Sequence, residues 1–293
     1  MTMILQPRDI KVLAHFARYF MLTSRQVREL EFPDDKTGRA TRRRLTLMAN
    51  EGLLRKRSLY VVNPKDGSAT PVYHLDRSGR DFLAGHFDEE TLRLLPIEPS
   101  QPQHLYHYVA VAESHRLFDE SITKTTEAVT IARWFNEDEI INPDVERASE
   151  RRYLRTDFNE SPKVVCIPDA AFLLNYGEHR IAVYLEQDRD TFFHDRVAAR
   201  KSRGYERLLA SKRHRQHFPE STFDFFYVLF VATTAKRADQ LCRAFAKRNQ
   251  ESDAAKVYRF AALDEVTADN LLFEPVLRCC HRDEKVSLIK RIE

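Results

Sequence analysis

The sequence is poor in glycine, with 7 such residues among 293. Loops that cradle phosphates need closely spaced glycines so that the backbone can approach the ligand. The scarcity of glycine argues against such a loop, and neither a P-loop nor a dinucleotide fingerprint occurs. No stretch of about 18 apolar residues occurs, and the N-terminus lacks the apolar core of an export signal. We therefore expect no membrane span and no membrane partner.

Cysteine is equally scarce. The chain has four, Cys166, Cys242, Cys279 and Cys280, without the paired CxxC spacing of common zinc sites. We predict reduced thiols and a cytoplasmic location. Cys279, Cys280 and His281 are adjacent and offer a metal site as an alternative, although buried or half-buried thiols explain such a group more often.

Neither sign of charge is in large excess, because the net charge is only +3. Basic residues nevertheless gather locally, and local patches attract polyanions more than the total charge does. An apolar share of 43% is ample for a core, and the length predicts about two domains.

The N-terminal part predicts three helices followed by a pair of strands. Apolar residues recur at helical spacing from Pro7 to Phe20, and Ser24 is the expected N-cap of a short second helix. A third helix begins at Arg39 and is stopped by Gly52. The segments RKRSLYVV and PVYHL then indicate two strands. This order is typical of a winged helix-turn-helix domain.

Basic residues in this part are candidates for contacts with double-stranded DNA. They lie at the N-terminal end of the third helix and in the expected wing, where phosphate contacts and base contacts by arginine are made. The alternatives are a solvated basic face on an ordinary helical bundle and a winged domain that binds proteins. The candidates are Arg39, Thr41, Arg42, Arg43, Arg44, Lys56, Arg57 and Lys65.

The segment 86–103 contains three prolines and predicts a linker between a DNA-binding domain, 1–85, and an α/β domain, 104–293. A helix follows the linker and carries several histidines. Their spacing is not the i, i+4 pair of zinc helices, so solvated or capping histidines are favoured over a metal site. The histidines are His104, His107 and His115.

The stretch 167–188, IPDAAFLLNYGEHRIAVYLEQD, predicts a hairpin of two buried strands that carries three acids. The turn at Gly177 places Tyr176 opposite His179. Counting outward from this pair brings three carboxylates to one face of the sheet. These acids are Asp169, Glu186 and Asp188.

Such a cluster needs compensation, because like charges about 5 Å apart destabilise a sheet. A divalent cation, protonation of one acid or basic neighbours would provide it. The basic helix that follows offers Arg196, Arg200 and Arg203 as partners, in which case the acids only support the scaffold. A register slip of one residue would remove the cluster altogether.

The rest of the chain predicts alternating elements: the basic helix, an apolar central strand FDFFYVLFVATT, a helix AKRADQLCRAFAKRNQ and a strand KVYRFAAL. Together with the hairpin they predict an α+β or α/β fold with a small mixed sheet.

The order of acids resembles that of PD-(D/E)XK nucleases. Pro168-Asp169 and Glu186-Gln187-Asp188 match the two strand motifs. The resemblance implies Mg²⁺ held by Asp169, Glu186 and Asp188, although Asp188 stands where the pattern has lysine. Lys201, from the following helix, is the expected substitute. The implied catalytic residues are Glu113, Asp169, Glu186 and Lys201.

More of the chain resembles the replication-relaxation family, which is associated with plasmids and other mobile elements. The resemblance rests on the basic third helix, on HYVAVAE beginning at His107, on PDA at Pro168 and on LEQDRDT followed by Lys201 and Tyr205. It implies a DNA-binding protein that assists a relaxase or replication protein at an origin.

Three functions therefore stay open. The first is an accessory protein for origin processing in mobilisation, replication or relaxation. The second is a Mg²⁺-dependent DNA endonuclease, and the third is a winged-helix repressor whose second domain only dimerises. Because winged-helix proteins often bind palindromic sites as pairs, we also expect a homodimer.

Overall fold

A computed structural model describes residues 4–59, 70–86, 104–142, 144–250 and 252–292. It divides into two compact units, Met1–His115 and Arg116–Glu293. The division lies inside helix α6 (Leu105–Lys124), later in the chain than the predicted boundaries at 85 and 104. Residues 87–103 of the predicted linker, and Lys65 in the predicted wing, lie outside the described residues.

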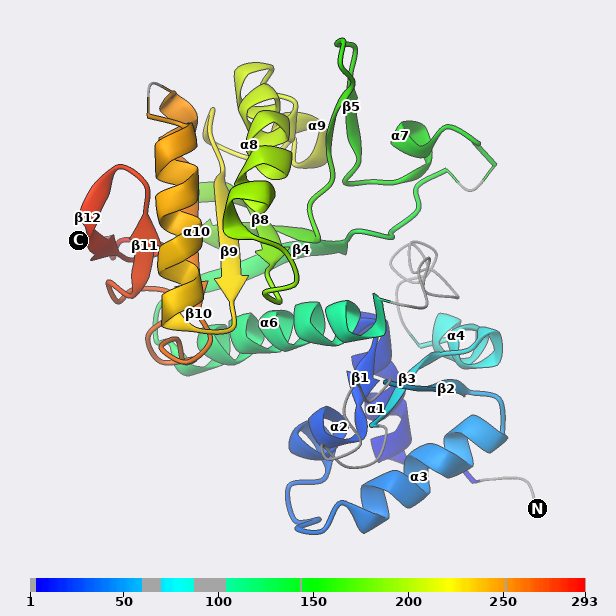
Figure 1. Cartoon of the computed structure of the whole chain (residues 1–293). Helices are drawn as coiled ribbons and strands as arrows, with labels where there is room; N and C mark the ends of the chain where they lie inside the picture. The colour runs from blue at the N-terminus through cyan, green and yellow to red at the C-terminus, as the bar shows by residue number, and fades with distance from the viewer. Residues whose placement is uncertain (1–3, 60–69, 87–103, 143, 251, 293) are drawn as a thin grey trace. The chain divides into compact units, whose positions relative to one another are not determined.

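The first unit combines helices with a small antiparallel sheet of order β1-β3-β2 (Figure 1). Its core is formed by buried apolar side chains of α1, α2, α3 and the sheet, including Phe16, Val27, Leu45, Met48 and Tyr73. The elements are α1 (Pro7–Tyr19), β1 (Leu22–Thr23), α2 (Ser24–Glu31), α3 (Arg39–Asn50), β2 (Leu54–Ser58), β3 (Pro71–Leu75) and α4 (Arg77–Ala84).

Local chemistry explains where these helices begin and end. The N-cap of α2 is Thr23 and not the predicted Ser24, because only Thr23 has a glutamine three residues later to complete a capping box. Gln26 N donates to Thr23 Oγ1 at 3.2 Å, and Thr23 N donates to Gln26 Oε1 at 2.8 Å. Gly52 follows α3 with a φ of 73°, the left-handed conformation that glycine adopts most easily.

The second unit is built on a seven-stranded mixed sheet of order β12-β11-β10-β9-β8-β7-β4. The pairs β8/β9 and β9/β10 are parallel, and the remaining pairs are antiparallel. Its strands are β4 (Val129–Asn136), β7 (Ala170–Tyr176), β8 (His179–Gln187), β9 (Tyr227–Ala232), β10 (Tyr258–Ala262), β11 (Leu277–Cys279) and β12 (Arg282–Val286).

Helices and a separate strand pair accompany this sheet. The strand pair consists of β5 (Thr156–Phe158) and β6 (Val164–Cys166). The helices are α7 (Ala148–Arg151), α8 (His194–Ala210), α9 (His214–His217), α10 (Ala235–Arg248) and the 3₁₀ turn η3 (Asp253–Lys256). The α+β class and the mixed sheet agree with the prediction.

The predicted hairpin is confirmed in its register. Tyr176 pairs with His179, and Gly177 at the turn has a φ of 56°. The predicted central strand is also confirmed, since β9 lies between β8 and β10. Three further strands that were not predicted, β4, β11 and β12, extend the sheet at both edges.

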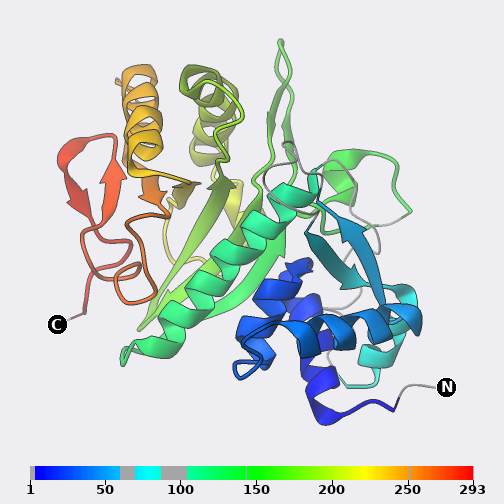
Figure 2. The ribbon, with the colours of Figure 1, turned by 60° about the horizontal axis from the view of Figure 1, so that its bottom comes forward.

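The two faces of the sheet are covered by different helices, as Figures 1 and 2 show. On one face α8 and α10 pack over aromatic side chains, with Tyr184 contacting Tyr205 of α8 and Phe230 contacting Phe245 of α10. On the other face the C-terminal half of α6 places Phe118 against Phe172 of β7, with ring centroids 4.7 Å apart.

Candidate functional site

The acids predicted on the hairpin meet a lysine at one end of β7 and β8. Asp169 directly precedes β7, and its backbone N–H donates to Leu185 O of β8 at 3.1 Å. Glu186 lies near the end of β8, on the face that α8 covers. Lys201 Nζ lies 2.5 Å from Glu186 Oε2 and 3.7 Å from Asp169 Oδ1.

Helix α8 brings Lys201 to this position because it packs tightly on β6. A Cβ on Gly204 would lie 2.8 Å from Val165 O, so only glycine allows the helix to approach this closely. Lys201 lies one turn before Gly204, on the same side of the helix. Its ammonium group also donates to Ile167 O at 2.9 Å.

The carboxylate oxygens of both acids have further partners. Tyr205, one turn after Lys201, donates from its hydroxyl to Glu186 Oε1 at 2.5 Å. The backbone N–H of Gln187 donates to Asp169 Oδ2 at 2.7 Å. Each oxygen of Glu186 therefore has its own donor, and we call Asp169, Glu186, Lys201 and Tyr205 the carboxylate–lysine cluster.

Burial controls the protonation of this cluster. The Glu186 side chain is 4% exposed, and its burial raises its pKa to about 8, although Lys201 opposes this shift. Burial acts to lower the pKa of Lys201, but the attraction of Glu186 and Asp169 outweighs it and the pKa rises. The Lys201 side chain is 27% exposed, so part of it is accessible from solvent.

Asp188 has a different partner from the other two acids. Arg237 of α10 binds it with two hydrogen bonds, of 2.7 and 2.9 Å, and also donates to Phe192 O at 2.6 Å. Asp190 accepts a further contact from Arg237 at 2.9 Å. The hydrogen bonds that Arg237 donates to Asp188 raise the pKa of Arg237. Asp188 is thus neutralised by a buried arginine, whereas the prediction brought all three acids to one cluster.

The arginines predicted to neutralise the acids have other contacts. Arg196 and Arg200 lie over the ring of Phe192, and Arg203 donates to Glu160 at 3.0 Å. Sequence reasoning missed Arg237 because it lies 49 residues beyond Asp188 in the chain. Only the parallel pairing of β8 with β9 brings the start of α10 to the end of β8.

Glu113, the predicted helix acid, belongs to the first unit. Its Oε2 accepts a hydrogen bond from Gln26 Nε2 at 2.7 Å. The metal-site alternatives at His115 and at the adjacent cysteines show ordinary contacts. His115 packs its ring edge against Tyr19, Cys279 Sγ contacts the carbonyl of Arg282, and Cys280 Sγ contacts the carbonyl of Cys242.

The predicted DNA-binding residues divide into two groups. Arg39, Arg42 and Arg43 on α3, together with Lys56 and Arg57 on β2, are exposed. Thr41 and Arg44 point into the unit. Thr41 is fully buried and donates from both N and Oγ1 to Asp35 Oδ2, at 2.8 and 2.7 Å. Arg44 forms an ion pair with Asp9, which is 1% exposed.

The carboxylate–lysine cluster has the donors that a hard cation prefers. Two carboxylates offer oxygen ligands of the kind that bind Mg²⁺, and the ammonium group of half-buried Lys201 lies beside them. Among the described residues, the ammonium group of Lys201 supplies the positive charge beside the two acids that a bound metal would otherwise supply. The donor set fits Mg²⁺, provided that Lys201 moves from Glu186 to a neighbouring anion.

The described residues contain no helix that is long and apolar enough to cross a membrane. Comparison with family models matches residues 13–220, most of the chain, to the family described as replication-relaxation. Searches of curated proteins and of solved structures gave no match.

Proposed function

Because the chain belongs to the replication-relaxation family, we propose that it is a DNA-binding protein that assists origin processing of a mobile element. The proposal rests on the first unit, whose order of three helices and paired strands is that of a winged helix-turn-helix domain. In such domains the third helix enters the major groove. A relaxase or replication protein as partner and a homodimer are part of this proposal.

One observation carries the proposal: α3 separates its apolar and basic side chains onto different faces. Leu45 and Met48 are buried in the core, whereas Arg39, Arg42 and Arg43 are exposed. We assign phosphate and base contacts to these three arginines and further phosphate contacts to Lys56 and Arg57 on β2. Thr41 and Arg44 are assigned to holding α3 in place.

Titration of double-stranded origin DNA with the full-length protein at several salt concentrations tests this assignment. Arg42→Ala should lower the slope of log affinity against log salt by about 0.9 if it loses one phosphate contact. Arg77→Ala, which removes an exposed cation of α4, is the matched control and should leave the slope unchanged. Equal slopes for the wild type and an Arg39, Arg42 and Arg43 triple alanine variant would refute the assignment.

The carboxylate–lysine cluster supports a second candidate function, a Mg²⁺-dependent DNA endonuclease. Asp169 and Glu186 would hold the ion, which would stabilise charge on the phosphate and lower the pKa of an attacking water. Lys201 would supply the positive charge of the lysine that the nuclease pattern has in place of Asp188, and Tyr205 would orient Glu186. Asp188 is assigned to a structural ion pair with Arg237.

Cleavage of supercoiled origin DNA in the presence of Mg²⁺, Mn²⁺ or EDTA separates the two candidates. Metal-dependent nicking by the wild type that is lost in both Asp169→Asn and Lys201→Met establishes the nuclease. Tight binding without nicking refutes it and leaves the accessory role. Asp190→Asn is the control, because it removes the charge of an exposed acid near the site. Asp190 contacts Arg237 but neither Lys201 nor Glu186 in the described contacts.

A further inference from the structure

An open pocket of about 800 Å³ lies in the second unit, on the face of the sheet opposite the carboxylate–lysine cluster. Opposed residues of neighbouring strands share a face, so Ile181 of β8, Tyr227 of β9 and Arg259 of β10 point to one side and Glu186 to the other. The pocket therefore belongs to neither candidate function above and is argued from its own residues.

A row of aromatic rings forms one wall of this pocket. In the segment FDFFY, Phe223, Phe225 and Tyr227 line the pocket, whereas Phe226 is fully buried on the other side. Ring centroids are 5.0 Å apart between Phe223 and Phe225 and 5.8 Å apart between Phe225 and Tyr227. Phe225 remains 38% exposed, so a flat ring is presented to solvent at the pocket.

A second wall of this pocket is cationic. Among the described residues that line the pocket, none is acidic, and five carry a positive charge: Arg259, Arg282, Lys285, Lys290 and Arg291. Glu265 and Glu127, which pair with Lys285 and Arg291, do not line it. The pKa of His281 is lowered, first by burial and then by the positive charges of Arg259 and Arg282. The second cause is expected where positive charges gather.

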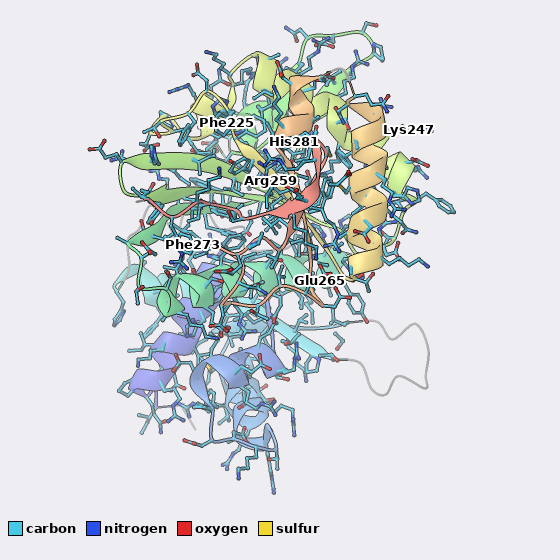
Figure 3. The ribbon with its side chains drawn as sticks, turned by 90° about the vertical axis from the view of Figure 1, so that its left-hand side faces the viewer. Phe225, Lys247, Arg259, Glu265, Phe273 and His281 are labelled. Carbon is cyan, nitrogen blue, oxygen red and sulfur yellow. The ribbon has the colours of Figure 1, made fainter. Side chains whose placement is uncertain are left out.

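Arg259 joins the two walls. It is 8% exposed, its guanidinium carbon lies 4.5 Å from the centroid of the Tyr227 ring, and its Nε has no hydrogen-bond partner. A buried polar group without a partner is costly, so this site favours a ligand that brings an acceptor. Figure 3 shows Phe225, Arg259 and His281 close to one another.

We propose that this pocket binds a nucleotide unit, with the base stacked on Phe225 and the phosphate held by Arg259 and Arg282. Every base offers a flat π-face to an aromatic side chain, and cationic side chains track the phosphates, which is the combination found in sites for single-stranded nucleic acid. An acidic peptide would use the cations but has no need of the exposed row of rings. The volume lies within the range of ordinary small-ligand sites.

A tryptophan at the aromatic wall provides a local test that DNA binding by the first unit does not affect. The chain has a single tryptophan, Trp134, which stacks on Phe172 of β7. In full-length F225W, stacking of a base should quench the added emission. The probes are hexathymidylate, an abasic hexamer with the same phosphates, and thymidine 5′-monophosphate, each titrated at low salt.

Hexathymidylate should quench F225W and bind at least about fivefold more tightly than the abasic hexamer, as expected for one stacked base. Adding Arg282→Ala to F225W should lower the slope of log affinity against log salt by about 0.7, the loss expected for one phosphate contact to a single strand. Adding Lys247→Ala, an exposed cation of α10 labelled in Figure 3, should change neither quantity.

The two sources of the nucleotide give different results. Tighter binding of the hexamer than of the monophosphate assigns the pocket to a strand, and equal affinity assigns it to a free nucleotide; both support nucleotide recognition. The proposal is overturned if neither hexathymidylate nor thymidine 5′-monophosphate quenches F225W. It is also overturned if the abasic hexamer competes as well as hexathymidylate does. If F225W fails to fold, photocrosslinking of wild-type protein to a 5-iodouracil hexamer replaces it, and crosslinks that do not map to 223–227 overturn the proposal.

Discussion

Replacing Lys201 by methionine tests the electrostatic account of the carboxylate–lysine cluster. Methionine keeps most of the side-chain volume but removes the ammonium group that lies 2.5 Å from Glu186 Oε2. Burial already raises the pKa of Glu186 to about 8 against the opposing influence of Lys201. Without Lys201 the pKa rises further, so Glu186 is protonated in the folded variant throughout the neutral range.

The size of the effect on stability follows from the difference in the pKa of Glu186 between the folded and the unfolded chain. Between about pH 5.5 and about pH 7.5, Glu186 is protonated in the folded Lys201→Met variant and ionised in the unfolded chain, whose glutamate pKa is about 4.3. Unfolding then releases a proton, so the free energy of unfolding falls as the pH rises. The loss is about 1.4 kcal/mol per pH unit, or about 2.7 kcal/mol across this window.

Urea unfolding followed through Trp134 measures this loss, since the only tryptophan lies in the second unit. The reference is the Lys201→Met, Glu186→Gln double variant, which lacks the titrating carboxyl but keeps every other group. Subtracting the free energy of unfolding of this reference from that of Lys201→Met at each pH isolates the contribution of Glu186. If the two variants keep a constant difference across the window, Glu186 is not held neutral by burial and the account is wrong.

Other predictions concern neighbouring contacts. Arg44→Ala leaves buried Asp9 without its charged partner and should cost about 3–5 kcal/mol in urea unfolding, against little change for exposed Arg43→Ala. Gly204→Ala should cost about 1–3 kcal/mol in thermal unfolding, because its Cβ would meet Val165 O at 2.8 Å, whereas Gly85→Ala has no atom nearer than 3.9 Å. Mg²⁺ binding measured by calorimetry should strengthen about tenfold per pH unit up to about pH 8, where Glu186 loses its proton, and Glu186→Gln should remove this dependence.

The hairpin was predictable because its turn and its alternating burial are local. Gly177 accepts a positive φ, and the apolar residues of both strands fix the register, which brings Asp169 beside Glu186. The apolar run of β9 was predictable for the same reason. By contrast, β11 is three residues long and β12 carries exposed charged residues, so neither has the apolar signal of a strand.

Partners distant in sequence were not predictable. The sequence offered Arg196, Arg200 and Arg203 to neutralise the acids because they follow directly, but α8 turns them toward Phe192 and Glu160. The true partner of Asp188 depends on strand order, which brings α10 to the end of β8. The position of Lys201 depends on the close packing of α8 on β6 at Gly204, which no spacing along the chain encodes.

The ion pairs of Asp188 and of Glu186 are best explained differently. Arg237 satisfies both oxygens of Asp188 and a backbone carbonyl, is itself nearly inaccessible, and closes the loop between β8 and α8, which is a structural role. Lys201 is more exposed and bridges two acids, of which only Glu186 is in close contact. Buried ion pairs contribute little to stability compared with apolar residues of similar volume. A Lys201→Met, Glu186→Leu variant that is as stable as the wild type would therefore mean that stability does not account for the cluster, and its charges would then be explained by the anion or cation that it binds.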